Sequence, residues 1–116
     1  MNFQENEQVG YLFAKIKRNL ESRDITYVND EDIYDEIEDA IEVVNEKRRF
    51  QATSNLLFEN RYKSLIVKMC VASITKWGAE GEKAHSENNI NRTYENGGQY
   101  PNSLLAQIIP LAKAGR

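Results

Sequence analysis

The fold is decided by residues 61–77, whose sequence is RYKSLIVKMCVASITKW. On a helical wheel one wide apolar face holds Leu65, Ile66, Met69, Cys70, Ser73 and Trp77, and Val67, Val71 and Ile74 extend it. The thin polar edge consists of Arg61, Ser64, Lys68 and Thr75. A helix with so little polar surface has to be covered from more than one side, by other helices of the chain or by a second subunit.

Length and composition indicate one soluble domain. The chain has 116 residues, 41% of them hydrophobic and 28% charged, and such a chain buries one core but not two. No apolar run approaches the roughly 18 residues of a membrane-spanning helix. The N-terminus lacks the pattern of a signal peptide, and the single cysteine cannot form an internal disulfide. We therefore expect synthesis in a reducing cytoplasm and no contact with a membrane.

Charge is distributed unevenly along the chain. Residues 1–46 hold 13 acidic and 4 basic side chains, whereas residues 47–116 hold 5 acidic and 11 basic ones, so a net charge of −9 precedes one of +6. Two interpretations stay open. Like subunits could associate head to tail, or the acidic helix of a monomer could lie over its own basic helix.

Two amphipathic helices are expected in the first half of the chain. The first spans about Glu7 to Leu20, and a connection over residues 21–29 follows it. Its apolar positions are Val9, Leu12, Phe13, Ile16 and Leu20, and those of the connection are Ile25, Tyr27 and Val28. Asn29 is a candidate N-cap for the second helix, because Asp32 follows three residues later.

The second helix has two faces of opposite character. Its apolar stripe is Ile33, Ile37, Ala40, Ile41 and Val44, and its acidic side is Asp35, Glu38, Asp39, Glu42 and Glu46. We favour a solvated surface for the acidic side, with a surface that keeps nucleic acid at a distance as the alternative.

A basic cluster, Lys47–Arg49, ends the second helix. We favour capping of the helix carbonyls over phosphate contact, because a nucleic-acid site needs a broader patch. Residues 51–56 are expected to turn, with Thr53, Ser54 or Asn55 capping the third helix. That helix is predicted from Leu57 to Trp77, with Gly78 as its end signal.

The C-terminal third contains weaker signals. Side chains at residues 90–95 alternate between two faces, with Ile90, Arg92 and Tyr94 on one of them, which is typical of a short strand. An Asn-Gly-Gly turn follows at 96–98. After Pro101, a final helix of about two turns is predicted, with Asn102 or Ser103 as its cap and Pro110 as its limit. Its apolar residues are Leu104, Leu105, Ile108 and Ile109. Closure of the core and contact with a partner are equally compatible with this helix.

The predicted fold class is mainly α, a small bundle of about four helices with a loop or short β-hairpin between the third and last helices. The single domain 1–116 divides into a helical core (1–77), a loop or strand segment (78–100) and a short C-terminal helix (101–112). His85 and Cys70 are the only residues of their types, so one chain cannot supply a Cys/His zinc set. Cys70 is expected to act as a small hydrophobe. We expect no enzyme activity, no metal and no cofactor.

A family resemblance extends in order over about residues 30–112, and its most specific part follows Trp77. It rests on Lys76-Trp77-Gly78-Ala79-Glu80-Gly81-Glu82, Ser86-Glu87-Asn88-Asn89-Ile90, Arg92-Thr93-Tyr94-Glu95-Asn96-Gly97 and Ser103-Leu104-Leu105 with Ile108-Ile109-Pro110. These motifs resemble the C-terminal half of the tailed-phage head-tail connector (adaptor) family. The chain departs from that pattern at Asn89, where similar sequences often have glycine, and asparagine tolerates the same left-handed turn.

The resemblance implies a structural protein of the virion neck, made in the host cytoplasm. Similar proteins form a homo-oligomeric ring, usually a dodecamer, which joins the portal to a downstream neck, stopper or tail protein. The ring extends the channel through which genomic DNA passes without specific binding. The implied subunit interface is Glu82, Glu87, Ile90, Arg92 and Tyr94; the implied portal-docking residues are Leu104, Leu105, Ile108 and Ile109; and the implied channel lining is Asp35, Glu38 and Glu42.

The alternative function is that of a small nucleic-acid-binding packaging or regulatory protein, resting on Lys47–Arg49 and the basic second half. The acidic isoelectric point of about 5.2 weighs against it.

Overall fold

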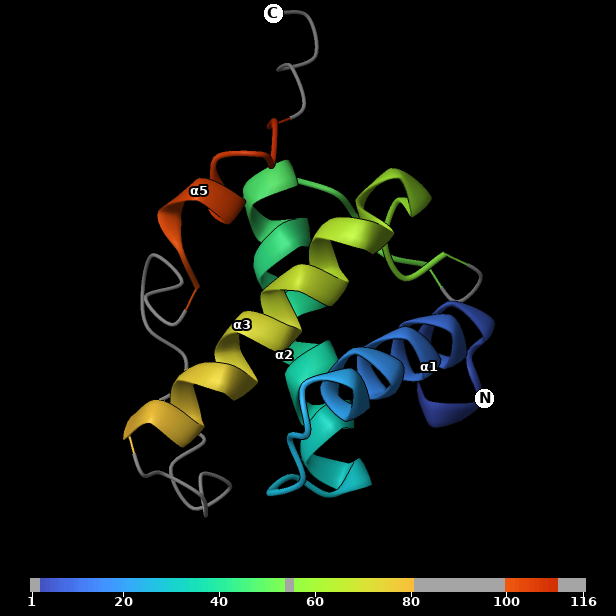
Figure 1. The fold of residues 1–116 in the computed structure, drawn as a ribbon. Helices are drawn as coiled ribbons and strands as arrows, with labels where there is room; N and C mark the ends of the chain where they lie inside the picture. The colour runs from blue at the N-terminus through green and yellow to red at the C-terminus, as the bar shows by residue number, and fades with distance from the viewer. Residues whose placement is uncertain (1–2, 54–55, 81–99, 111–116) are drawn as a thin grey trace, which may run out of the picture.

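Three long helices pack together in the computed structural model, which describes residues 3–53, 56–80 and 100–110 (Figure 1). The elements are η1 (Phe3–Glu5), α1 (Glu7–Ser22), α2 (Asp30–Arg48), η2 (Asn60–Tyr62), α3 (Lys63–Glu80) and α5 (Asn102–Leu105). The described residues contain no strand. The predicted class, a small and mainly helical bundle, is therefore confirmed. The predicted strand at 90–95 and the turn at 96–98 lie outside the described residues.

Helix α3 is the centre of the core. It packs against both α1 and α2, and in Figure 1 it crosses in front of α2. Its buried residues are Leu65, Ile66, Val67, Met69, Cys70, Val71, Ser73 and Ile74. The predicted polar edge at Arg61, Ser64, Lys68 and Thr75 is exposed. The prediction that this helix is covered from more than one side is confirmed, and its own chain provides the cover.

Helices α1 and α2 contribute the apolar faces that their sequences predict. The apolar stripe of α2 is buried, as are Val9, Leu12, Ile16 and Leu20 of α1, while Phe13 is partly buried and stacks on Tyr34 with ring centroids 4.5 Å apart. Asn29 caps α2 as predicted. Its Oδ1 accepts from the Asp32 N–H at 2.8 Å, and the Asp32 carboxylate accepts from the Asn29 N–H at 3.2 Å.

The predicted start of the third helix at Leu57 is wrong. Helix α3 begins at Lys63, after the short turn η2. The side chain of Gln8 binds the Leu57 N–H (2.7 Å) and the Phe58 carbonyl (2.8 Å), and Asn45 Nδ2 donates to the Leu57 carbonyl at 2.8 Å. Backbone groups held in this way cannot enter a helical ladder, so residues 56–59 stay non-helical between α1 and α2.

Capping of this helix by Thr53 is also wrong. Thr53 Oγ1 accepts from the Leu56 N–H at 3.0 Å and so closes the preceding turn. Ser54 and Asn55 lie outside the described residues.

The predicted end at Trp77 is three residues early, because α3 passes through Gly78 and continues to Glu80. Glycine adopts the right-handed helical conformation as well as the left-handed one, so it permits a helix end without imposing one. Helix α3 therefore extends past residue 77, where the helical core was predicted to end.

The last helix is also shorter than predicted. Helix α5 makes a single turn, Asn102–Leu105, and its N-cap is Pro101 in place of Asn102 or Ser103. A helix this short gains little from its own hydrogen bonds and depends on packing. That packing comes from α3 and from Ile108, which is buried in the core.

Candidate functional site

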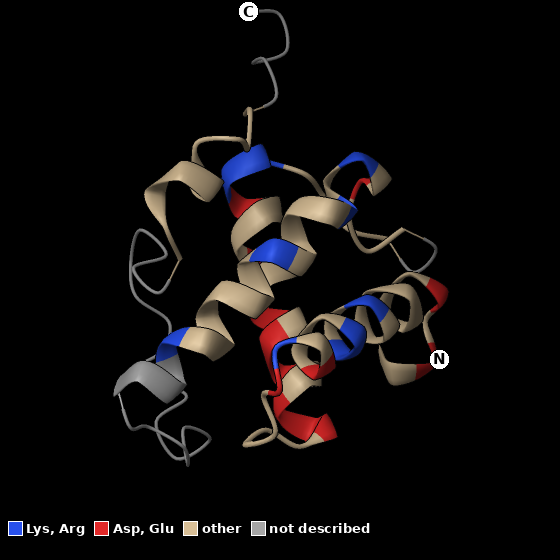
Figure 2. Ribbon diagram, in the orientation of Figure 1, with Lys and Arg blue, Asp and Glu red and all other residues tan. Residues whose placement is uncertain are grey.

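An acidic stripe runs along α2, formed by Glu31, Asp35, Glu38, Glu42 and Glu46. Three- and four-residue spacing places these carboxylates on one side of the helix, opposite the buried aliphatic stripe. Asp35 is half-buried and the other four are exposed. Figure 2 shows acidic residues gathered along the first part of α2 and basic ones at its end and along α3.

The stripe is not neutralised within the described part of the chain. The ion pairs there join Lys17 to Asp30 (2.8 Å) and Arg48 to Glu59 (2.5 Å), and neither includes a stripe carboxylate. The hydrogen bond that the Lys17 ammonium donates to the Asp30 carboxylate raises the pKa of Lys17. Helices α2 and α3 meet through their apolar faces. The acidic helix therefore does lie on α3, but its stripe makes no ion pair there within the described residues, so both interpretations of the charge distribution stay open.

Arg49 is the C-cap of α2, and its backbone N–H bonds to the Asn45 and Glu46 carbonyls, in keeping with the capping interpretation of the basic cluster. Arg48 instead lies on the core side of α2, which neither interpretation predicted. Arg48 is 8% exposed, its Nε and Nη2 donate to the Glu59 carboxylate, and its Nη1 donates to the Ile109 carbonyl at 2.6 Å. The hydrogen bond to Glu59 raises the pKa of Arg48. The arginine therefore caps none of its own helix carbonyls through these bonds, and it is unavailable to phosphate.

The four implied portal-docking residues divide into two groups. Ile108 is buried, and Leu104 and Leu105 pack against the core, so these three close the domain. Ile109 is 59% exposed. Its N–H donates to the Tyr62 hydroxyl at 3.1 Å, and its carbonyl accepts from Arg48, so a fixed backbone presents an exposed aliphatic side chain.

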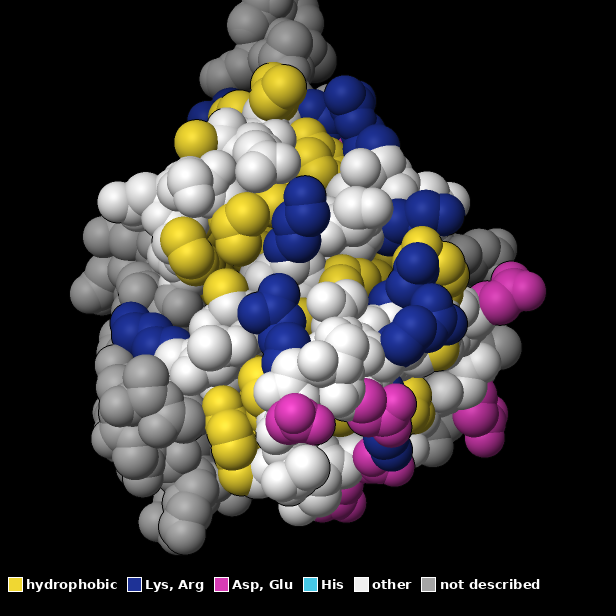
Figure 3. Space-filling view, viewed as in Figure 1, with side chains coloured by type: hydrophobic (Ala, Val, Ile, Leu, Met, Phe, Trp, Pro, Cys, Tyr) yellow, Lys and Arg dark blue, Asp and Glu magenta, His cyan; other side chains and the backbone are white. Residues whose placement is uncertain are grey.

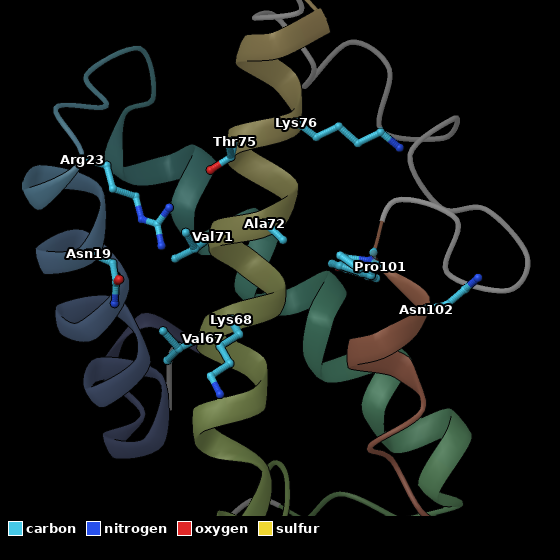
Figure 4. Close-up of a pocket in the computed structure, with 11 residues that line it drawn as sticks. Asn19, Arg23, Val67, Lys68, Val71, Ala72, Thr75, Lys76, Pro101 and Asn102 are labelled. Carbon is cyan, nitrogen blue, oxygen red and sulfur yellow. The ribbon is translucent and has the colours of Figure 1, made fainter.

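An open groove of about 760 Å³ lies along α3, between the end of α1 and the start of α5 (Figure 4). We call it the α3 groove. Its lining is Asn19, Arg23, Val67, Lys68, Val71, Ala72, Thr75, Lys76, Tyr100, Pro101 and Asn102. Figure 3 shows this side of the molecule, with blue side chains spread across it and magenta ones confined to its lower right. Sequence analysis did not predict the groove, because its walls are distant in the chain.

Several predicted site residues lie outside the described residues, namely the implied interface set Glu82, Glu87, Ile90, Arg92 and Tyr94, together with His85. In the ranges that are described, no group of acidic, histidine or cysteine side chains could hold a metal ion. Glu36 is fully buried on α2, and sequence reasoning missed it because one more carboxylate on an acidic helix carries no distinguishing signal.

The fold and these surfaces define a small helical bundle with one acidic face and one basic groove. No family model, curated protein or solved structure matches the chain. None of the described helices combines the length and the hydropathy that crossing a bilayer requires.

Proposed function

We propose that this chain is a head-tail connector (adaptor) of a tailed-phage neck, which forms a ring between the portal and the downstream neck or tail proteins. The resemblance over residues 30–112 supplies the family, and a small helical bundle is compatible with it. The observation that carries the proposal is the acidic stripe, whose five carboxylates are aligned and make no ion pair within the described residues. The functional role of this surface lies outside the monomer.

In such a ring the acidic stripe lines the DNA channel through Asp35, Glu38 and Glu42. Protein interfaces are depleted of charge at their cores, so a face made only of carboxylates suits a solvated lumen better than a subunit contact. Carboxylates repel the phosphate backbone and keep passing DNA from binding. In this proposal the segment that contains Glu82, Glu87, Ile90, Arg92 and Tyr94 makes the contact between subunits.

Ile109 is the proposed portal contact, because Leu104 and Leu105 pack against the core and Ile108 is buried in it. The Ile109 backbone is held on both sides, by Tyr62 and by Arg48, so little conformational freedom is lost on binding. An exposed aliphatic side chain on a fixed backbone is a suitable anchor for a partner pocket.

The assembly test combines the purified chain with its cognate portal protein, with light scattering and imaging of rings as the measurements. Wild type is expected to bind the portal and form rings on it. Ile109→Asp should abolish binding without unfolding the chain, because the side chain is largely exposed. Ser103→Asp, at an exposed position of α5, is the matched control and should bind. Failure of wild type to bind the portal would contradict the proposal.

The channel test uses Glu38→Lys combined with Glu42→Lys. Assembled rings of this variant should retain duplex DNA at low salt and release it as salt rises, whereas wild-type rings should not retain it. If DNA passes both rings equally, the stripe does not face the channel.

The alternative of nucleic-acid binding loses part of its basis in the structure. It rests on Lys47–Arg49, and Arg48 is buried against Glu59. Salt-dependent DNA binding by the wild-type monomer would revive it.

A further inference from the structure

We propose that the α3 groove is a docking site for an acidic amphipathic segment of another protein. The inference rests on the groove alone and does not depend on the connector assignment. It assigns to this surface a partner whose carboxylates flank a stripe of aliphatic side chains.

The first argument is charge. Arg23 from the end of α1 and Lys68 and Lys76 from α3 line the groove, and none of the described lining residues is a carboxylate. All three cations are exposed, and none is ion-paired within the described residues. Figure 4 shows Arg23 reaching from α1 toward α3. In a protein of net charge −3, three cations around one concavity favour an anionic occupant.

The second argument is the apolar floor, which decides the class of occupant. Val67, Val71 and Ala72 lie between the cations, and Pro101 contributes to the opposite wall. A nucleic-acid backbone would place phosphates over these aliphatic groups, which offer them no hydrogen bond. A peptide with aliphatic residues between its carboxylates matches both the floor and the rim. The lining therefore favours an acidic peptide over nucleic acid.

The third argument is the length of the groove and the burial of its floor and wall. The lining positions of α3 run from Val67 to Lys76, about 14 Å of helix, which suits a partner helix of roughly three turns. The floor is part of the core, since Val67 is 8% exposed and Val71 is 6% exposed. The opposite wall begins at Tyr100, which is 4% exposed. Such a floor and wall keep their shape without the partner, and a pre-formed groove costs little to occupy.

The experiment is a selection of short random peptides displayed against the immobilised full chain. Enriched peptides are expected to contain more Asp and Glu than Lys and Arg, with aliphatic residues between the acidic ones. An enriched peptide, labelled for fluorescence anisotropy, should lose affinity about tenfold or more for Lys68→Glu combined with Lys76→Glu. Ala72→Phe, which fills the floor, should weaken the same peptide.

The matched control is Arg18→Glu combined with Lys47→Glu, which makes the same change in charge outside the lining. It should retain the peptide affinity of wild type, and circular dichroism of every variant should match wild type. Three results would overturn the proposal. The wild-type chain could enrich no peptides beyond those that the Ala72→Phe variant enriches in a parallel selection, or the enriched peptides could be non-acidic. The third is a peptide affinity that stays the same in the groove variants. Binding of duplex DNA that depends on Lys68 and Lys76, without peptide enrichment, would assign the groove to nucleic acid instead.

Discussion

Arg48 holds three parts of the chain together through one side chain. It stands at the end of α2, pairs with Glu59 before η2, and binds the Ile109 carbonyl beyond α5. Its guanidinium carbon also lies 5.7 Å from the Tyr62 ring centroid. A planar fork with five donors can make all of these contacts at once, whereas a lysine ammonium cannot.

Replacing Arg48 should therefore release the C-terminal segment. Arg48→Met leaves the Glu59 carboxylate and the Ile109 carbonyl without this donor. Arg48→Lys should hold the C-terminal segment less firmly than wild type but more firmly than Arg48→Met. Proteolysis by a nonspecific protease should remove the C-terminal segment from Arg48→Met faster than from wild type, while Arg18→Met, at an exposed position, behaves as wild type. Equal cleavage of Arg48→Met and wild type would contradict this role.

The pH dependence of this effect follows from the raised pKa of Arg48. A group with a raised folded-state pKa contributes its stability below its ordinary pKa and loses it only as pH rises through the folded-state value. Arginine titrates far above neutrality. The difference in cleavage between wild type and Arg48→Met should therefore be the same at neutral and at mildly alkaline pH.

Gln8 performs a corresponding role for the residues next to Glu59. Its amide accepts from the Leu57 N–H and donates to the Phe58 carbonyl, which replaces the helical bonds that residues 56–59 do not make. Gln8→Ala should lower the free energy of unfolding by about 1–3 kcal/mol, because partly buried backbone groups lose their partners. Chemical denaturation measures this loss. Gln51→Ala, at an exposed position, should differ from wild type by less than about 0.5 kcal/mol.

At the scale of the element, α1 contains a glycine that its packing does not need. A Cβ added at Gly10 would meet no atom within 4 Å, and the position is exposed. Glycine within a helix costs about 0.5–1 kcal/mol relative to alanine, because it loses more backbone freedom on folding.

Gly10→Ala should therefore stabilise the protein by about 0.5–1 kcal/mol, measured by chemical denaturation. Ala14→Gly, one helical turn further at another exposed position, is the reciprocal control and should destabilise by a similar amount. A destabilised Gly10→Ala variant would indicate that this surface of α1 contacts something beyond the described residues.

At the scale of the whole molecule, the acidic stripe should oppose the stability of the monomer. Like charges four residues apart on a helix repel by a few tenths of a kcal/mol per pair, and Glu38–Glu42 and Glu42–Glu46 are two such pairs. A cost of this kind is expected where a surface serves a partner or a passing polyanion and not the fold.

Glu38→Gln combined with Glu42→Gln should accordingly raise the free energy of unfolding by about 0.5 kcal/mol at low salt. Added salt should reduce this gain, because it screens the repulsion. Glu21→Gln on α1 has the opposite setting, with Lys17 and Arg18 one turn before it, and should not stabilise. Thermal unfolding at two ionic strengths distinguishes these outcomes.

The sequence by itself determined the helical class, the buried faces and the N-cap of α2. These features depend on residues within a few positions of one another: the aliphatic spacing of 61–77, and the pair Asn29 and Asp32. Local backbone sterics and the burial of one face act at that range, so they can be predicted from the order of residues alone. The acidic stripe was evident for the same reason.

The tertiary structure alone decided where α3 begins, what Arg48 binds and that the α3 groove exists. Gln8 lies 49 residues from Leu57, and Arg48 lies 61 residues from Ile109. Such partners compete with local preference only after the helices have packed, since a hydrogen bond gains its value when both groups leave water together. For that reason a helix predicted from Leu57 begins at Lys63, and an arginine expected to cap its own helix is buried against Glu59.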